Sequence, residues 1–123
     1  SSTHGDLNRR NFVLFRGQIS IIDWGLYRRF SSFLLDAVHY HVIHEARRAR
    51  CSWVDIVFHS AIAWPPIRAL ACRFQLDPFQ LLAAYAIHRA SSEGNQFFSR
   101  RRTLPVHIKR KYNRVYRLIE ERL

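Results

Sequence analysis

Residues 4–25 read HGDLNRRN-FVLF-RGQ-ISII-DWG, and this stretch decides the fold of the first quarter of the chain. Two runs rich in β-branched and aromatic residues, 12–15 and 19–22, are separated by 16–18, a short connection that contains glycine. This order predicts a β-hairpin. Polar residues lie directly before the first run and directly after the second. Because a hairpin brings the outer ends of its strands together, the sequence predicts that these two polar segments are neighbours.

The rest of the chain has helical periodicity. Ser31 and Ser32 are candidate N-caps, apolar residues then recur at steps of three and four, and Pro65 and Pro66 stop the second helical segment. Residues 91–95 favour a break, and 91–102 is the candidate linker. We expect helices over the following segments: 32–48, 52–64, 66–73, 77–90 and from about 105 onward. The fold class predicted is therefore α+β and mostly α, with one hairpin followed by about five helices.

Composition limits the class of protein. The 123 residues carry 20 Lys and Arg against nine Asp and Glu, a net charge of +11, and 48% of them are hydrophobic. Such a chain is too apolar for intrinsic disorder, and its length is below the usual allowance of about 150 residues for one domain. No apolar run approaches the roughly 18 residues that a membrane-spanning helix needs. We therefore expect a single basic domain, 1–123, with neither a membrane span nor a signal peptide.

The two cysteines of the chain give an indication of its cellular compartment. Cys51 and Cys72 lie far apart in sequence and form no C-x-x-C pair. This usage fits reduced thiols in a cytoplasmic protein better than a disulfide framework or a zinc site. We expect both side chains to be small buried apolar groups.

The polar segments beside the hairpin have the residue types that phosphoryl transfer needs. Residues 4–11 have the spacing H-x-D-x-x-x-x-N, and Asp23 follows the second strand. One carboxylate must orient an attacking hydroxyl and accept its proton, and hard oxygen ligands must hold Mg²⁺ on the nucleotide phosphates. Asp6 suits the first role, and Asn11 and Asp23 suit the second.

These segments also resemble a known family. The HGDL of residues 4–7 with Asn11, followed by the IDWG of residues 22–25, is similar to the catalytic and metal-binding loops of the aminoglycoside phosphotransferase and choline kinase-like family, which are relatives of the protein kinases. The resemblance covers residues 3–25 and extends more weakly to about residue 40. It implies that the chain is the C-terminal lobe of a kinase-like fold, with the catalytic loop, hairpin and metal loop in 1–25 and the helical part in 32–123.

The resemblance also implies roles for individual residues. Asp6 would be the catalytic aspartate, Asn11 and Asp23 the magnesium ligands, and His4 a supporting residue. Asp36 stands where members of that family often have an aspartate that braces the catalytic loop from the first helix. The implied cofactors are Mg²⁺ and ATP as co-substrate, and the implied reaction is phosphorylation of a hydroxyl group on a small molecule.

One part of the kinase-like pattern is missing from this sequence. The family uses an N-terminal lobe whose loop covers the phosphates and whose strand lysine pairs with them. No such lobe lies within the 123 residues, and the two lysines, Lys109 and Lys111, lie in the basic C-terminal segment. We expect the chain to be either a catalytic lobe separated from a longer protein or a degenerate remnant, and to be inactive by itself. Nucleotide-binding residues are not assigned.

The acceptor is left open among sugars, including anionic envelope polysaccharide precursors, aminoglycosides and amino alcohols. Aminoglycosides are polycations that an acidic pocket would bind, so the charge of +11 argues against them.

Two other features offer alternative functions. Residues 97–123 hold nine basic and two acidic residues interleaved with aromatics, which suits an anionic membrane surface or nucleic acid, although no recognised nucleic-acid module accompanies them. The rival hypothesis is therefore a catalytically inert basic helical module. His39, His41, His44 and Glu45 offer metal ligands at helical spacing, but without H-E-x-x-H or a thiolate we favour solvated or packed histidines.

Overall fold

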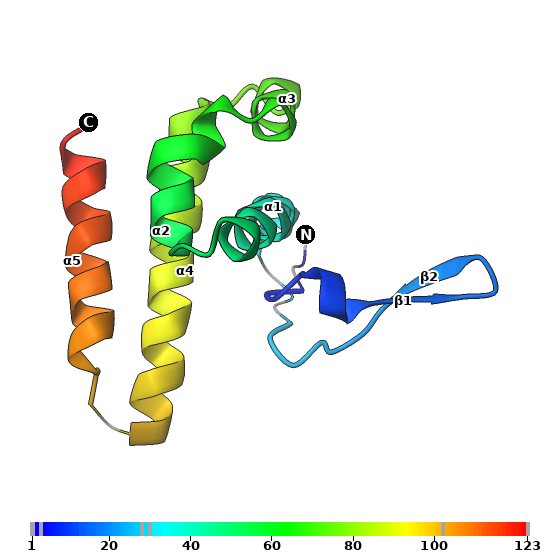
Figure 1. Cartoon of the computed structure of the whole chain (residues 1–123), viewed down its shortest axis with the longest axis horizontal. Coiled ribbons are helices and arrows are strands. Elements are labelled where there is room, and N and C mark those ends of the chain that lie inside the picture. The colour runs from blue at the N-terminus through cyan, green and yellow to red at the C-terminus, as the bar shows by residue number, and fades with distance from the viewer. Residues whose placement is uncertain (1, 3, 28, 30, 102, 123) are drawn as a thin grey trace. The chain divides into compact units, whose positions relative to one another are not determined.

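The computed structural model describes residues 2, 4–27, 29, 31–101 and 103–122. The chain divides into two compact units, Ser1–Ile56 and Val57–Leu123, and each is described by itself. Among the described residues, one antiparallel hairpin and five helices make up the regular structure, with helix predominating (Figure 1). The α+β, mostly helical class predicted from the sequence is confirmed. None of the described helices is both long and apolar enough to cross a membrane.

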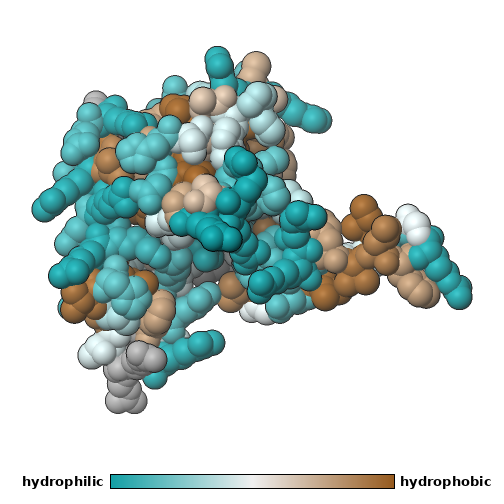
Figure 2. Space-filling model, in the orientation of Figure 1, coloured by the Kyte–Doolittle hydropathy of each residue, from teal (hydrophilic) through white to brown (hydrophobic). Residues whose placement is uncertain are grey.

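The first unit begins with the predicted hairpin. Strands β1 (Phe12–Phe15) and β2 (Gln18–Ile21) pair antiparallel, with Phe15 opposite Gln18. Only Arg16 and Gly17 form the turn, and both have positive φ, 49° and 75°, as a type I′ turn requires. The predicted second strand, 19–22, begins one residue too late, because Gln18 pairs with Phe15 and does not lie in a three-residue turn. Both strands are exposed along their length, and Figure 2 shows apolar side chains covering the hairpin.

Helix α1 (Phe33–Ala49) follows as predicted. The Ser32 hydroxyl accepts a hydrogen bond from the Leu34 N–H and caps its start. Val38, Val42 and Ala46, spaced four residues apart, are buried and form the apolar stripe that the periodicity indicated. Arg50 ends the helix in the left-handed conformation, and α1 contacts the single turn of α2 (Trp53–Asp55).

The helix predicted over 52–64 is present but changes pitch along its length. After α2 come a π-helical turn, Ile56–Ser60, and a 3₁₀ turn, Ala61–Ala63, before Trp64 and Pro65 end it. Ser52 caps its start by accepting from the Val54 N–H. The expectation that this segment is mostly buried is confirmed; the buried apolar residues are Trp53, Val54, Ile56, Val57, Phe58 and Ala61.

The second unit continues with α3 (Pro65–Arg73) and the long helix α4 (Pro78–Arg101). Asp77 caps α4 by accepting from the Gln80 N–H, as its place before a proline suggested. The predicted end near residue 90 and the predicted linker over 91–102 are wrong, because α4 continues through Ser91–Asn95 without a break.

Packing of α5 (Val106–Glu120) against α4 explains this continuity. The two helices lie side by side in Figure 1, and α5 buries Ile108, Val115 and Ile119. The Glu93 carboxylate accepts from Lys111 Nζ at 3.0 Å and pairs with Arg89 one turn earlier in α4. Tertiary contacts therefore override the weak helix propensity of the Ser91–Asn95 segment.

Gly94 has a packing role in this contact. A Cβ added to Gly94 would lie 1.7 Å from the Tyr112 hydroxyl and 2.7 Å from the adjacent ring carbon. Burial raises the pKa of the Tyr112 hydroxyl, which agrees with a ring seated against α4. Glycine at residue 94 thus supplies space for an aromatic ring and not a break in the helix.

Two expected core residues are on the surface. Cys51 and Cys72 are free thiols and both are exposed, contrary to the expectation of burial. Trp24 also lies on the surface, with half of its area exposed. Its indole Nε1 donates to the Ile21 carbonyl oxygen at 2.9 Å, so this ring lies over the end of the hairpin.

We predict that Gly94→Ala destabilises the protein by about 1–3 kcal/mol, because the new methyl group displaces the Tyr112 ring and outweighs the gain in helix propensity. Urea denaturation followed by circular dichroism measures the change. Ser91→Ala, an exposed position of the same helix, is the control and should alter the free energy of unfolding by less than about 0.5 kcal/mol. In a Tyr112→Ala background the penalty of Gly94→Ala should disappear, and a penalty that persists there would contradict this account.

Candidate functional site

The loop of residues 4–11 depends on Gly5. Its φ is +86°, and an added Cβ would lie 2.3 Å from the Leu26 carbonyl oxygen. Any other side chain would therefore meet both a disfavoured backbone conformation and a backbone clash. The loop ends in a single 3₁₀ turn, Arg9–Asn11, which the Asn8 side chain caps by accepting from the Arg10 N–H.

Asp36, in the first turn of α1, braces this loop. Its two carboxylate oxygens accept from the His4 N–H at 2.6 Å and from the Gly5 N–H at 2.9 Å. The prediction that Asp36 accepts hydrogen bonds from the His4–Asp6 segment is confirmed. An ionised acceptor forms stronger hydrogen bonds with N–H groups than a neutral one, so these two bonds hold the loop against the helix.

His4 links the two polar segments. Its ring is buried, and Nε2 lies 2.8 Å from the Ile22 carbonyl oxygen, which can only accept. Nδ1 accepts a longer hydrogen bond, 3.4 Å, from the Asp6 N–H. The carbonyl contact places a hydrogen on Nε2. The Trp24 ring packs against His4 with the ring centroids 4.6 Å apart.

Ile22 is held from both sides by the first loop. Besides the His4 contact to its carbonyl, its N–H donates to the Asn11 carbonyl oxygen at 2.9 Å. Both backbone polar groups of the residue before Asp23 are therefore fixed by the segment that carries Asp6. The sequence prediction that the two polar segments are neighbours is confirmed.

Asp6 is held in place at its carbonyl and at its side chain. The amide groups of Asn8 and Asn11 both donate to the Asp6 carbonyl oxygen, at 3.0 and 2.8 Å. The His39 ring places Nε2 3.2 Å from Asp6 Oδ1, and 40% of the Asp6 side chain is exposed. A carboxylate oriented by these partners and still reachable from solvent can interact with a bound hydroxyl compound.

His39 is the residue that sequence reasoning did not assign. It was grouped with His41, His44 and Glu45 as a candidate metal ligand, whereas it is a buried partner of Asp6 from α1. The available signal was its position three residues after Asp36, which places both on one side of the helix. Within the part of the chain that the structure describes, no three His, Cys, Asp or Glu side chains gather to hold a metal ion.

The donor set for the Mg²⁺ that the resemblance implies is Asn11 and Asp23. Because a carbonyl oxygen can only accept, the Asn11 amide must direct Nδ2 to Asp6, which turns Oδ1 away from that carbonyl. Asp23 is exposed with φ of +60°, and its Oδ1 would lie 3.5 Å from a Cβ at Gly25. Amide and carboxylate oxygens are hard ligands that suit Mg²⁺. Their convergence with Asp6 on one ion stays a prediction.

The nucleotide part of the site does not fit this chain alone. Lys111 is bonded to Glu93 in the second unit, and Lys109 lies in the same helix. The described residues thus supply oxygen ligands for a metal ion, but no strand lysine that could pair with ATP phosphates.

Comparison of the chain with protein-family models, with curated proteins and with solved structures finds no match in any of the three. We therefore infer function from the residues and the geometry of the site.

We predict that Asp36→Asn destabilises the loop and lowers the free energy of unfolding by about 1–3 kcal/mol. The asparagine side chain keeps one acceptor oxygen, but its NH2 group is a donor and cannot accept from the second backbone N–H. Amide hydrogen exchange measured by NMR should show faster exchange at the His4 and Gly5 amides. Glu120→Gln, which removes the same charge at an exposed position, is the control and should leave these rates unchanged. Unaltered exchange at both amides in Asp36→Asn would rule out the brace.

Proposed function

We propose that this chain is the catalytic lobe of a kinase-like phosphotransferase that uses ATP and Mg²⁺ to phosphorylate a hydroxyl group of a small molecule. The observation that carries the proposal is the connection between the Asp6 loop and the Asp23 loop. The His4 ring and the Asn11 carbonyl bind the two backbone groups of Ile22, directly before Asp23. The Ile22 N–H bond continues the β1–β2 ladder, and the His4 ring adds a side-chain bond between the two loops.

In the proposed reaction, Asp6 orients the acceptor hydroxyl and accepts its proton as the hydroxyl oxygen attacks the γ-phosphorus of ATP. The bond from the γ-phosphorus to the bridging oxygen breaks, and ADP leaves with the electron pair. His39 Nε2 lies 3.2 Å from Asp6 Oδ1 and so orients the carboxylate. Such positioned proton transfer contributes about 10²–10⁴-fold to a rate.

Magnesium would be held by Asn11 Oδ1 and the Asp23 carboxylate, and it would offset the negative charge of the phosphates. Asp36 and His4 act on these residues indirectly. Asp36 fixes the loop backbone, and His4 carries that constraint to the second loop. Their task is positioning, because neither side chain is needed to contact the reacting atoms.

We predict that Asp6→Asn lowers kcat at least about 100-fold with little change in the KM for Mg·ATP, since the variant keeps the metal ligands but loses the proton acceptor. Asp23→Asn should raise the KM for Mg·ATP as well. Phosphate transfer from labelled ATP, measured on the natural protein that contains residues 1–123, tests both, with Glu120→Gln as the control for charge. The 123 residues alone should show no micromolar affinity for Mg·ATP in calorimetry, because both lysines lie in α5.

If Asp6→Asn retains activity within threefold of the unsubstituted protein, Asp6 is not the catalytic carboxylate and the proposal fails. Micromolar binding of Mg·ATP to the 123-residue chain would overturn the proposal that a separate lobe is needed to bind the nucleotide.

A second candidate function concerns α5. Ile108, Val115 and Ile119 are buried and hold the helix in place, while Lys109, Arg110 and Arg117 are exposed. We propose as the alternative that this basic surface binds nucleic acid or anionic lipid while the kinase-like motif is inert.

For this alternative we predict that the combined substitution Arg110→Gln and Arg117→Gln weakens binding to a single-stranded RNA or to phosphatidylglycerol vesicles at least about tenfold, and that binding falls steeply with salt. Fluorescence anisotropy measures the first and vesicle sedimentation the second. Arg73→Gln, an exposed arginine on α3, is the matched control. Absence of binding to both at low salt would remove this alternative.

A further inference from the structure

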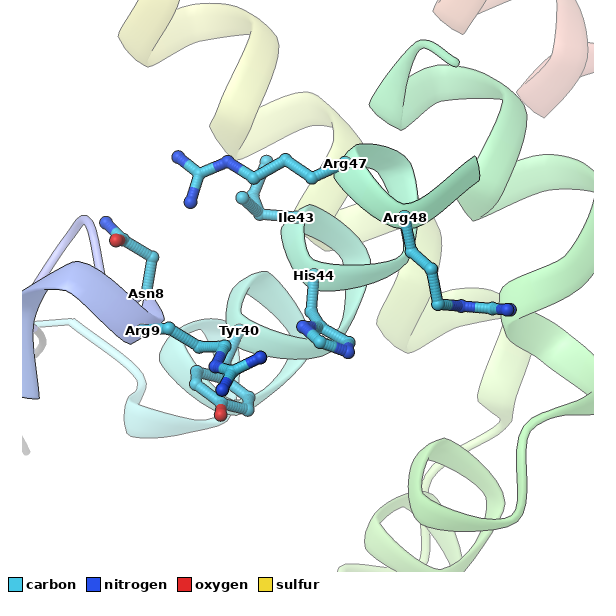
Figure 3. Close-up of a pocket in the computed structure, with 7 residues that line it drawn as sticks. All are labelled: Asn8, Arg9, Tyr40, Ile43, His44, Arg47 and Arg48. Carbon is cyan, nitrogen blue, oxygen red and sulfur yellow. The ribbon is translucent and has the colours of Figure 1, made fainter. Parts of the chain in front are cut away.

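A cavity of about 460 Å³ opens in the first unit beside the Asp6 loop (Figure 3). The loop contributes Asn8 and Arg9, and α1 contributes a run of residues from Tyr40 to Arg48. Pockets that hold small molecules have volumes of about 300–1,000 Å³, so a sugar or a compound of similar size fits.

Helix α1 has two different faces. Val38, Val42 and Ala46 point into the core. The cavity side carries Tyr40, Ile43 and Arg47, at the spacing i, i+3 and i+7 that forms a continuous stripe on a helix. Tyr40 and Arg47, the polar residues of this stripe, therefore both line the cavity.

The cavity carries uncompensated positive charge. Arg48 is paired with Glu45, with Nε 3.0 Å from Oε2, and this hydrogen bond lowers the pKa of the Glu45 carboxyl. Neither Arg9 nor Arg47 has an ion pair or side-chain hydrogen bond with another described residue. Figure 3 shows Arg47 extending to the side of α1 on which Asn8 and Arg9 lie, whereas Arg48 extends to the other side. Two arginines are therefore available to an anion.

The remaining wall is flat and partly apolar. The Tyr40 and His44 rings are nearly parallel, with an interplanar angle of 5° and their centroids 6.5 Å apart. Ile43 adds an aliphatic surface beside them. Aromatic rings of this kind contact the C–H faces of ring compounds and leave their hydroxyl groups at the edge for hydrogen bonds.

The cavity is connected to the proposed catalytic residue by two short links. Asn8, which lines the cavity, donates to the Asp6 carbonyl oxygen at 3.0 Å. Tyr40, which also lines it, follows His39, whose ring contacts Asp6 Oδ1. A molecule in the cavity is thus adjacent to Asn8, one of the groups that hold Asp6, and to the residue that follows His39 in α1.

We propose that this cavity binds the anionic group of the acceptor, and that the acceptor is a hydroxyl compound of the sugar class that carries a phosphate or a carboxylate. Arg9 and Arg47 hold the anion, the Tyr40 and His44 rings contact the sugar, and a hydroxyl group of the same molecule reaches Asp6. The inference rests on the proposed phosphotransferase function, whose acceptor it specifies.

Binding is tested on the 123-residue chain by two-dimensional NMR with four probes: glucose 6-phosphate, glucuronate, glucose and glucosamine. We expect the two anions to bind with dissociation constants on the order of 1 mM and to shift the amide signals of Asn8, Arg9 and Tyr40. Glucose should bind at least tenfold more weakly, and glucosamine should bind no better than glucose. The ratio of the dissociation constants of glucose 6-phosphate and glucuronate shows whether the site prefers a phosphate or a carboxylate. Equal shifts with all four probes would overturn the proposal.

Substitutions locate the site. Arg9→Gln and Arg47→Gln should each weaken glucose 6-phosphate binding about tenfold, because each removes a charged donor to the anion. Arg10→Gln is the matched control, since Arg10 lies in the same turn, is exposed and does not line the cavity. It should leave the dissociation constant within twofold. Equal losses for Arg9→Gln and Arg10→Gln would mean a general charge effect and would overturn the proposed site.

Asp6→Asn distinguishes this inference from the proposed function. If that variant and the unsubstituted chain bind glucose 6-phosphate equally and the natural protein transfers no phosphate, the anion site stands and the phosphotransferase proposal fails. If the natural protein phosphorylates glucose and glucose 6-phosphate with the same KM, and Arg47→Gln changes neither, the phosphotransferase proposal stands and the anion site fails.

Discussion

The rest of the first unit depends on the carboxylate of Asp36. It accepts hydrogen bonds from the adjacent N–H groups of His4 and Gly5, 32 and 31 residues away in sequence, and so ties this loop to the first turn of α1. Directly after these two bonds the loop turns at Gly5, whose φ of +86° lies in a region that other residues rarely adopt. With the loop backbone fixed, the His4 ring is directed to Ile22 and the Asp6 side chain to His39.

Helix α1 therefore does more than cover the core. Asp36, His39, Ile43 and Arg47 recur at steps of three and four, which places them along one side of the helix. That stripe contains in succession the brace of the loop, the partner of Asp6 and the wall of the cavity. Because a helix fixes these positions through its backbone, the spacing between brace, carboxylate partner and arginine is set by α1 and does not depend on loop conformation.

Local patterns were sufficient for the features that depend on neighbouring residues. The hairpin, the Ser32 cap and the apolar stripe of α1 were predicted because turn chemistry and helical periodicity are written in short segments. The prediction failed at Ser91–Asn95, where Glu93 and Gly94 meet Lys111 and Tyr112 from another helix. It also missed His39, whose partner is 33 residues away. Nothing in a local pattern reports which distant residue will pack against it.

Electrostatics gives the anionic cavity a reason to lie beside Asp6. An acceptor with its own negative charge must approach both an ionised aspartate and the phosphates of ATP. Each like-charge pair at about 4 Å costs roughly 4 kcal/mol at an effective dielectric constant of 20. Arg9 and Arg47, without carboxylate partners among the described residues, can offset such repulsion where it arises. Glu45 neutralises Arg48, which extends to the other side of α1. Among the described residues, the unpaired positive charge near the cavity is therefore that of Arg9 and Arg47, beside the loop where the proposed reaction would take place.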